Sequence, residues 1–399
     1  MPEIHTIIAG PWRGVLVLGV TQIITWGTLF YPPVLTLPLI AAERGWSLTF
    51  AMGGFSLGLL MAGIASPLVG RLIDRHGGHR VMPVGSLLAA AGLIALVYAD
   101  HPVAYLAVWM LLGVAIAASL YDAAFATLGR IFGGSARSPI TALTLAGGLA
   151  STASWPATYL LVQGMGWRGT YLVYAAVLAL VAAPLHAFVL PRLRAAEPPP
   201  PAIDSAAPVR APILPSHGWA FAMVAAAFAA YAFVPSALSA HLLAIFGRAG
   251  LDAATVVMIG TLFGPSQVVA RICELAFARS VHPLAIARLA VGLLLAAFAL
   301  LALLGVSVPV AAVFMVMFGM ANGLITIARG TVPLALFGPV GYGALIGRIA
   351  GPCLVMQAMA PLVLAFVAER ASDPAALALT AALALMALLC LALLRPPKG

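Results

Sequence analysis

The sequence predicts an all-α membrane protein whose twelve transmembrane helices form two pseudo-symmetric halves of six. Of the 399 residues, 63% are hydrophobic and 8% are charged, whereas a soluble domain is about 25% charged. The apolar residues fall into twelve runs, each close to the roughly 20 residues that cross a bilayer. A proline-rich segment divides these runs six and six. This composition excludes a soluble enzyme.

The first half, 1–189, holds six candidate spans. The N-terminus leads directly into an apolar run that is longer than a signal-peptide core of 7–15 residues and lacks a cleavage site, so we expect an uncleaved first span. Charges and turn residues bound the later runs. The spans are predicted at 14–40, 48–69, 81–99, 103–129, 138–162 and 168–189.

The segment 190–217 is expected to be a cytoplasmic linker. Its four consecutive prolines, Pro198 to Pro201, forbid a continuous helix and favour extended, solvated chain. The second half, 218–399, repeats the pattern of the first. Its spans are predicted at 218–246, 253–275, 284–304, 308–329, 342–368 and 374–394.

Basic residues encode the orientation. When the spans are threaded from the inside, 16 of the 20 lysines and arginines fall on the side of the N-terminus, as cytoplasmic loops require. We expect a multi-pass protein of a bacterial-type inner membrane, surrounded by lipid, monomeric, with both termini cytoplasmic. The dispersal of the basic residues argues against a nucleic-acid partner. The three cysteines lie far apart, so no metal, disulfide framework or cofactor is expected.

Short internal matches indicate that the two halves arose by duplication. Arg71-Leu72-Ile73-Asp74 matches Arg271-Ile272-Cys273-Glu274 at an offset of 200, and Thr127-Leu128-Gly129-Arg130 matches Thr326-Ile327-Ala328-Arg329 at 199. Both offsets are close to half the chain length, and duplicated halves are typical of transporters.

The segment 70–80 reads GRLIDRHGGHR and lies between the second and third spans. It resembles the G-x-L-x-D-R-x-G-x-R loop signature of the major facilitator superfamily. With twelve spans and a central loop, the resemblance covers the whole chain and implies the fold of that superfamily and secondary transport. The matching positions are Gly70, Leu72, Asp74, Arg75, Gly77 and, one position later than usual, Arg80.

Two shorter motifs resemble one branch of that superfamily. Gly45-Trp46-Ser47 after the first span and Gly166-Trp167-Arg168 after the fifth look like the turns of the monocarboxylate and oxalate/formate transporters. The sequence departs from the drug/proton antiporter pattern, because Trp109 stands where that pattern has an arginine in the fourth span.

A cytoplasmic gate is expected around Asp74. Its carboxylate, beside arginines, can form ion pairs and face a helix N-terminus across the seam between the halves; the alternative is a solvated loop that only fixes orientation. Repeat symmetry predicts Arg130 near Asp74 and Arg329 near Glu274. The gate residues are expected to be Asp74, Arg75, Arg71, Arg130, Arg271, Glu274 and Arg329.

Three ionisable residues lie deep in predicted spans, where charge is costly and therefore points to function. Asp122 either carries a proton or pairs with a gate arginine. His241 either binds an anion and carries a proton or hydrogen-bonds a neighbour. Arg348 either binds a substrate carboxylate bidentately or lies at the inner leaflet.

Prolines point to a central site, because Pro32 and Pro33 in the first span and Pro235 in the seventh are expected to interrupt helices at corresponding positions. Packing is the alternative for these prolines and for the polar side chains. Gly347 and Gly351 permit close helix approach. The candidate substrate-binding residues are Arg348, His241, Tyr31, Gln22, Tyr231, Trp155, Asn322 and Gln357.

The sequence therefore predicts a secondary transporter that moves a small organic anion, such as a monocarboxylate, by alternating access and with protons as the coupling ion. ATP drive is not expected, because the only lysine is Lys398 and a Walker A motif needs one. An efflux permease for a drug or toxic metalloid, with Cys273 and Cys353 as thiolate ligands, is the alternative. A non-transporting membrane sensor is a third hypothesis.

Overall fold

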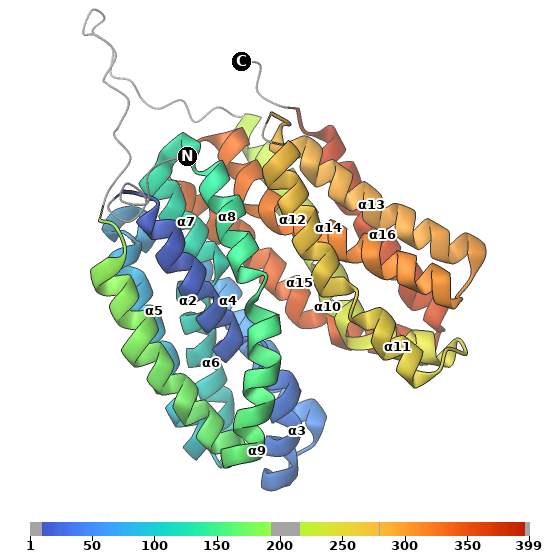
Figure 1. The fold of residues 1–399 in the computed structure, drawn as a ribbon, viewed down its shortest axis with the longest axis horizontal. Coiled ribbons are helices and arrows are strands. Elements are labelled where there is room, and N and C mark those ends of the chain that lie inside the picture. The colour runs from blue at the N-terminus through green and yellow to red at the C-terminus, as the bar shows by residue number, and fades with distance from the viewer. Residues whose placement is uncertain (1–9, 193–215, 279, 396–399) are drawn as a thin grey trace, which may run out of the picture.

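The computed structural model describes residues 10–192, 216–278 and 280–395 (Figure 1), so the predicted linker lies almost entirely outside the described residues. The described chain is helical throughout, without a strand. The N-terminal group of helices comprises α2 (Arg13–Leu29), α3 (Pro33–Arg44), α4 (Leu48–His76), α5 (Gly78–Tyr98), α6 (Pro102–Ser119), α7 (Tyr121–Phe132), α8 (Arg137–Gly147) and α9 (Ala150–Val177), followed by the π-helical turns η2 (Leu178–Ala182) and η3 (Leu185–Val189).

The second group of helices follows residue 215. Most of its buried apolar residues form a core of their own, while six between Leu334 and Ala358 join the core of the first group. The C-terminal group comprises α10 (Ser216–Arg248), α11 (Ala253–Gly260), α12 (Phe263–Phe277), α13 (Pro283–Leu304), α14 (Val308–Phe337), α15 (Tyr342–Arg370) and α16 (Asp373–Leu393).

Twelve membrane spans account for these helices. Eleven apolar segments are long enough to cross a bilayer, and one of them, Arg137–Val189, has 53 residues. A straight helix of that length would reach about 80 Å, far more than the roughly 30 Å of a hydrocarbon core. Gly166, with φ 70° and ψ 176°, breaks it into 137–165 and 167–189. The predicted twelve-helix fold is confirmed.

Helix interruptions agree with the sequence in the first span and differ in the seventh. The first span breaks between Leu29 and Pro33, as predicted. The prediction for Pro235 was wrong, because α10 continues through it. A proline removes only its own N–H bond, and here the neighbouring Ser236 hydroxyl ties α10 to α15 by donating to the Gln357 carbonyl at 2.8 Å.

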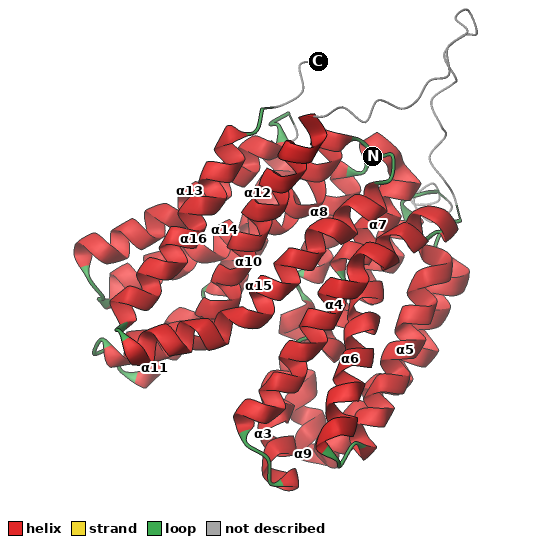
Figure 2. Cartoon of the chain, turned by 180° about the vertical axis from the view of Figure 1, so that it is seen from behind, coloured by secondary structure: helices red, strands yellow, loops and turns green. Residues whose placement is uncertain are grey.

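The two groups converge at one end and diverge at the other (Figures 1 and 2). We call the end at which α2 begins and α16 ends the closed end, and the opposite end, which carries α3 and α11, the divergent end. The contacts across the seam join α4 to α15, α7 to α14 and α15, and α8 to α12 and α14. The seam is therefore sealed from its middle to the closed end.

Small residues allow α4 and α15 to touch backbone to backbone. A Cβ on Gly70 would lie 2.0 Å from the Gly343 carbonyl oxygen, and one on Gly347 would lie 2.2 Å from that of Ser66. A Cβ on Gly63 would meet the Gly351 carbonyl at 2.9 Å. The expected role of Gly347 and Gly351 in close helix approach is confirmed.

Candidate functional site at the seam between the helix groups

At the closed end, the carboxylate of Asp74 on α4 caps the N-terminus of α15. Its Oδ1 accepts the Gly343 N–H at 2.8 Å, and its Oδ2 accepts the Ala344 N–H at 2.7 Å. The N-cap residue Gly341 has φ 64° and offers no side chain to these amides, so the other helix group satisfies them. Anionic groups are stabilised at such helix ends. This is the geometry expected for Asp74.

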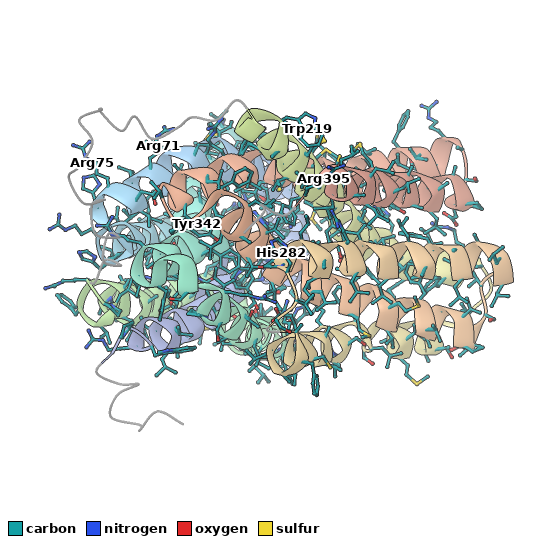
Figure 3. The ribbon with its side chains drawn as sticks, turned by 90° about the horizontal axis from the view of Figure 1, so that it is seen from above. Arg71, Arg75, Trp219, His282, Tyr342 and Arg395 are labelled. Atoms are coloured by element: carbon teal, nitrogen blue, oxygen red, sulfur yellow. The ribbon has the colours of Figure 1, made fainter. Side chains whose placement is uncertain are left out.

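The arginines around Asp74 divide into two kinds. The Arg130 guanidinium donates to the Asp74 backbone carbonyl, so these two residues are neighbours, as repeat symmetry predicted. Arg71 and Arg75 are exposed and lie at the margin of the closed end, whereas Tyr342 lies among the helices (Figure 3). Tyr342 packs over Gly129 of α7, where a Cβ would meet its ring at 2.2 Å.

A second cross-seam contact involves Glu274 on α12. Its Oε1 lies 3.0 Å from Arg137 Nη2, and its Oε2 accepts the Thr141 hydroxyl at 3.1 Å. Arg137 also donates to the Ala278 carbonyl, at the C-terminus of α12, at 2.7 Å. The predicted pairing of Arg329 with Glu274 was wrong. α8 presents a guanidinium to Glu274, and Arg329 pairs elsewhere.

Arg329 on α14 pairs with Asp122 on α7. The fourth span breaks at the extended residue Leu120, which places Asp122 in the first turn of α7. Its Oδ2 accepts from Arg329 Nη2 at 2.8 Å, with 16% and 25% of the two side chains exposed. Asp122 Oδ1 and Arg329 Nε are buried without a hydrogen-bond partner. The pair thus crosses the seam with bonding capacity left over.

Arg271 on α12 lies in the same seam and is 4% exposed. Its Nη1 donates to the Thr144 carbonyl of α8 at 2.8 Å, and its Nη2 donates to Gln267 Oε1 at 3.3 Å. Its Nε is buried without a partner. Among the described residues, Arg271 has no carboxylate partner, unlike Arg137 and Arg329.

A glycine pair makes room for this guanidinium. A Cβ on Gly148 would lie 2.2 Å from Arg271 Nη1, and one on Gly147 would lie 2.3 Å from the Tyr121 hydroxyl. The break between α8 and α9 at these glycines therefore admits a charged group from the C-terminal group beside a phenol from the N-terminal group. Arg271 Nη1 and the Tyr121 hydroxyl thus lie against two adjacent glycines.

Two predicted amide residues support this neighbourhood. Gln22, fully buried, donates to the Ser119 carbonyl at 2.8 Å and accepts the Trp26 indole N–H at 3.1 Å. Asn322 on α14 donates to Gln267 Oε1 at 3.0 Å, beside Arg271. Of the predicted ligands, Asn322 lies beside Arg271 through Gln267, whereas Gln22 and Tyr31 are neighbours of Trp26.

Other predicted ligands lie elsewhere. Arg348 is exposed, with its guanidinium 4.6 Å from the Phe221 ring centroid. His241 hydrogen-bonds the Pro361 carbonyl at 2.9 Å and lines a hollow of about 300 Å³ with Arg248, Glu369 and Asp373. Trp155 is 43% exposed and Tyr231 is 4% exposed, and no described contact joins Trp155, Tyr231 or the Gln357 side chain to Arg271. Cys273 is exposed and Cys353 is buried.

The two tryptophan turns have a packing role. Arg44 lies between the rings of Trp46 and Trp167, 5.2 and 5.1 Å from their centroids. Trp167 donates to Glu43 at 2.6 Å. Gly45 and Gly166 both have positive φ, a conformation that glycine adopts without strain. These turns tie together the divergent end of the N-terminal group.

Sequence reasoning missed Arg137 and Thr141 as partners of Glu274, and it placed Arg271 only in the gate. Arg137 was visible as a basic residue after a Gly-Gly-Ser turn, but its partner was not. That Arg271 forms no ion pair among the described residues, although Glu274 follows it by one turn on α12, is a property of packing that the sequence alone does not report.

Comparison with known proteins accounts for this arrangement. Residues 16–350 match the sequence model of the Major Facilitator Superfamily. The chain belongs to this superfamily. It is a multi-pass membrane transporter and not an enzyme. A 150-residue segment is 33% identical to monocarboxylate transporter 11 of Homo sapiens, covering 37% of this chain and 31% of that protein. The crystal structure of the human organic anion transporter MFSD10 (TETRAN) superposes with a TM-score of 0.69 at 18% identity, over 98% of this chain and 100% of that one.

Proposed function

We propose that this superfamily transporter moves a small organic anion, such as a monocarboxylate, by alternating access and in exchange with or together with protons. The observation that carries the proposal is the buried Arg271 guanidinium, which lies in the seam without a carboxylate partner among the described residues. A desolvated cation without a counter-charge is costly, and an anionic substrate removes that cost. The printed names of the two relatives, a monocarboxylate transporter and an organic anion transporter, support the same class.

The substrate carboxylate is assigned to the Nε and Nη2 edge of Arg271. Guanidinium binds carboxylates bidentately along such an edge. Nε has no partner, and the bond from Nη2 to Gln267 is long at 3.3 Å. An incoming carboxylate therefore displaces one long bond to a neutral amide and forms two bonds to an anionic acceptor. The Thr144 carbonyl holds Nη1 in place during this exchange.

The closed end is assigned to the cytoplasm, which follows the positive-inside bias of the sequence. The conformation is then outward-open, with a monomer in a bacterial-type inner membrane and both termini inside. Three contacts across the seam oppose inward opening. They are the cap that Asp74 forms at the N-terminus of α15, the ion pair of Glu274 with Arg137 and the ion pair of Asp122 with Arg329. Rocking of the two groups must break all three.

Proton coupling is assigned to Asp122. When the seam opens, Asp122 loses Arg329, and a buried carboxylate without its counter-charge favours the protonated form. The unpartnered Oδ1 offers a position for that proton. A proton taken up on opening and released on closing would tie proton movement to the cycle.

Transport in proteoliposomes tests the proposal. Uptake of labelled acetate and pyruvate is measured for the wild type, for Arg271→Gln and Arg271→Lys, and for Arg348→Gln as an exposed control. Removing one partner of a desolvated charge pair costs roughly 2–5 kcal/mol, so Arg271→Gln should lower uptake at least about 30-fold, while Arg348→Gln leaves it unchanged. Arg271→Lys keeps the positive charge but lacks the two parallel N–H donors of guanidinium, so it should retain only part of the uptake.

Three results would overturn the proposal. Carboxylate uptake that survives Arg271→Gln would remove the assigned ligand. Indifference to every carboxylate, with flux of drugs or metalloids instead, would favour the efflux alternative. Replacement of both Cys273 and Cys353 would then decide whether thiolates are involved. Absence of any solute flux would favour the membrane sensor.

A further inference from the structure

Four aromatic side chains of the N-terminal group form a continuous surface near Arg271, which we call the aromatic wall: Trp26, Phe30, Tyr31 and Tyr121. The Trp26 ring centroid lies 4.7 Å from that of Phe30, 5.1 Å from that of Tyr121 and 6.1 Å from that of Tyr31. None of the four is fully buried. The wall therefore keeps ring surface available for contact.

The orientation of the wall is fixed by polar contacts. The Trp26 indole N–H donates to the Gln22 side-chain oxygen. The Gln22 amide in turn donates to the Ser119 carbonyl, at the break in the fourth span. Tyr121 stacks on Phe125 with an interplanar angle of 5°. Rings held in this way lose little conformational entropy when they bind a ligand.

The wall and the guanidinium belong to different helix groups. Arg271, Gln267 and Asn322 come from the C-terminal group, and the rings come from the N-terminal group. Tyr121 joins the two parts, because its hydroxyl lies against Gly147 while Arg271 Nη1 lies against the adjacent Gly148. A ligand whose carboxylate bonds to Arg271 thus presents the rest of its structure to aromatic faces and edges.

Charge counting limits the ligand to one carboxylate. Three arginines of the described chain bond across the seam, and two of them, Arg137 and Arg329, are compensated by Glu274 and Asp122. A second carboxylate on the ligand would find no unpaired guanidinium there, and burying an unpaired charge is costly.

We propose that the substrates are monocarboxylates that carry an aromatic ring, with the ring packed on Trp26 and Tyr121 and the carboxylate on Arg271. This inference rests on the proposed function and narrows it. Aromatic pairs at centroid distances of 4.5–7 Å gain stability beyond that of buried area, and edge-to-face or offset geometry suits a mobile ligand ring.

A neighbouring aromatic cluster, which Phe55 joins to Phe30 of the wall, provides the contrast. Trp46, Phe50, Tyr105 and Trp109 pack at the divergent end of the N-terminal group, with Trp109 2% exposed and the Tyr105 hydroxyl bonded to the Ala51 carbonyl at 2.6 Å. Among the described residues, the arginine beside it is Arg44, which pairs with Asp100. It is a packing cluster and supplies the control variant.

The test is competition for uptake of labelled acetate in proteoliposomes by phenylacetate, acetate and the dianion phenylsuccinate. The wild type should be inhibited roughly 3- to 10-fold more strongly by phenylacetate than by acetate, and only weakly by phenylsuccinate. Trp26→Leu should abolish the advantage of phenylacetate over acetate as a competitor. Phe50→Leu in the packing cluster should preserve the advantage.

The outcomes separate this inference from the proposed function. Acetate uptake that depends on Arg271 but shows no preference for phenylacetate overturns the aromatic assignment and leaves anion transport standing. An equal loss of inhibition by phenylacetate and by acetate in Trp26→Leu also overturns it. The Trp26 ring would then have only a structural role. If no carboxylate is taken up or competes, both proposals fall.

Discussion

Asp122 Oδ2 and Arg329 Nη2 lie 2.8 Å apart and join the two helix groups through one ion pair. The repeat matches Arg329 with Arg130, yet Arg130 bonds to a backbone carbonyl of its own group. The two halves therefore use equivalent arginines differently. This asymmetry places one charged pair where a conformational change must separate it.

Asp122→Asn should uncouple transport from the proton gradient. The amide keeps the size of the side chain but neither takes up a proton nor forms the ion pair. We expect carboxylate exchange at equal pH to persist while accumulation driven by a pH gradient is lost. Uptake with and without an imposed gradient, and with a protonophore, measures this directly.

A double-mutant cycle with Arg329→Gln provides the control. If the pair is energetically coupled, the effect of the double substitution on uptake should be smaller than the sum of the effects of the two single substitutions. Gradient-driven accumulation by Asp122→Asn at the wild-type level would refute the assigned proton role.

Asp74→Asn should weaken the closed end. A carboxylate at a helix N-terminus contributes about 1 kcal/mol, so the ratio of closed to open seam should fall about fivefold. Ser66, which is 2% exposed beside Gly347, serves as the reporter when replaced by cysteine in a chain without native cysteines. Its modification by a membrane-impermeant thiol reagent from the closed side should become faster. Arg75→Gln, at an exposed position, should leave that rate unchanged.

The sequence predicted the membrane spans and the position of Asp74 for a physical reason. Hydropathy locates spans because the bilayer fixes their length, and the position of Asp74 follows from a loop signature that ends one helix and faces another. Both are properties of segments. The twelve spans and the cap on α15 were therefore predictable.

The partners of buried charges were not predictable for a different reason. Each residue turns a helix by about 100°, so a small error in helix rotation or depth exchanges one neighbour for another. Glu274 meets Arg137 and Thr141, while Arg329 meets Asp122. Arg348 shows the same effect, because Gly347 faces α4 whereas its neighbour Arg348 lies exposed against Phe221.

Gly70→Ala should prevent the seam from closing. The added methyl group would lie 2.0 Å from the Gly343 carbonyl oxygen, and overpacking of this kind costs roughly 1–3 kcal/mol. We expect loss of uptake together with faster modification of the Ser66→Cys reporter. Gly53→Ala, on the same helix with nothing within 4 Å of its Cβ, is the matched control and should keep wild-type uptake. Normal uptake by Gly70→Ala would show that α4 and α15 need not come this close.

His282 should make the stability of the protein depend on pH. Burial lowers the pKa of His282 below its usual 6.5, and the nearby charges of Arg137 and Arg288 lower it further. Its Nδ1 caps α13 by accepting the Leu284 N–H at 3.2 Å, which requires an unprotonated Nδ1. Below pH 6.5 the unfolded chain binds this proton more readily than the folded protein does, so stability falls as the pH falls.

His282→Asn isolates that contribution, because asparagine keeps an N-cap acceptor and does not titrate. The wild type and the variant should have similar Tm values at pH 7.5. Between pH 6.5 and pH 5 the Tm of the wild type should fall more steeply, since only its cap is lost on protonation. The other histidines are common to both proteins, so the difference between the two curves belongs to His282. Parallel curves would mean that His282 binds its proton equally well in the folded and the unfolded protein, and would refute the assigned pH dependence.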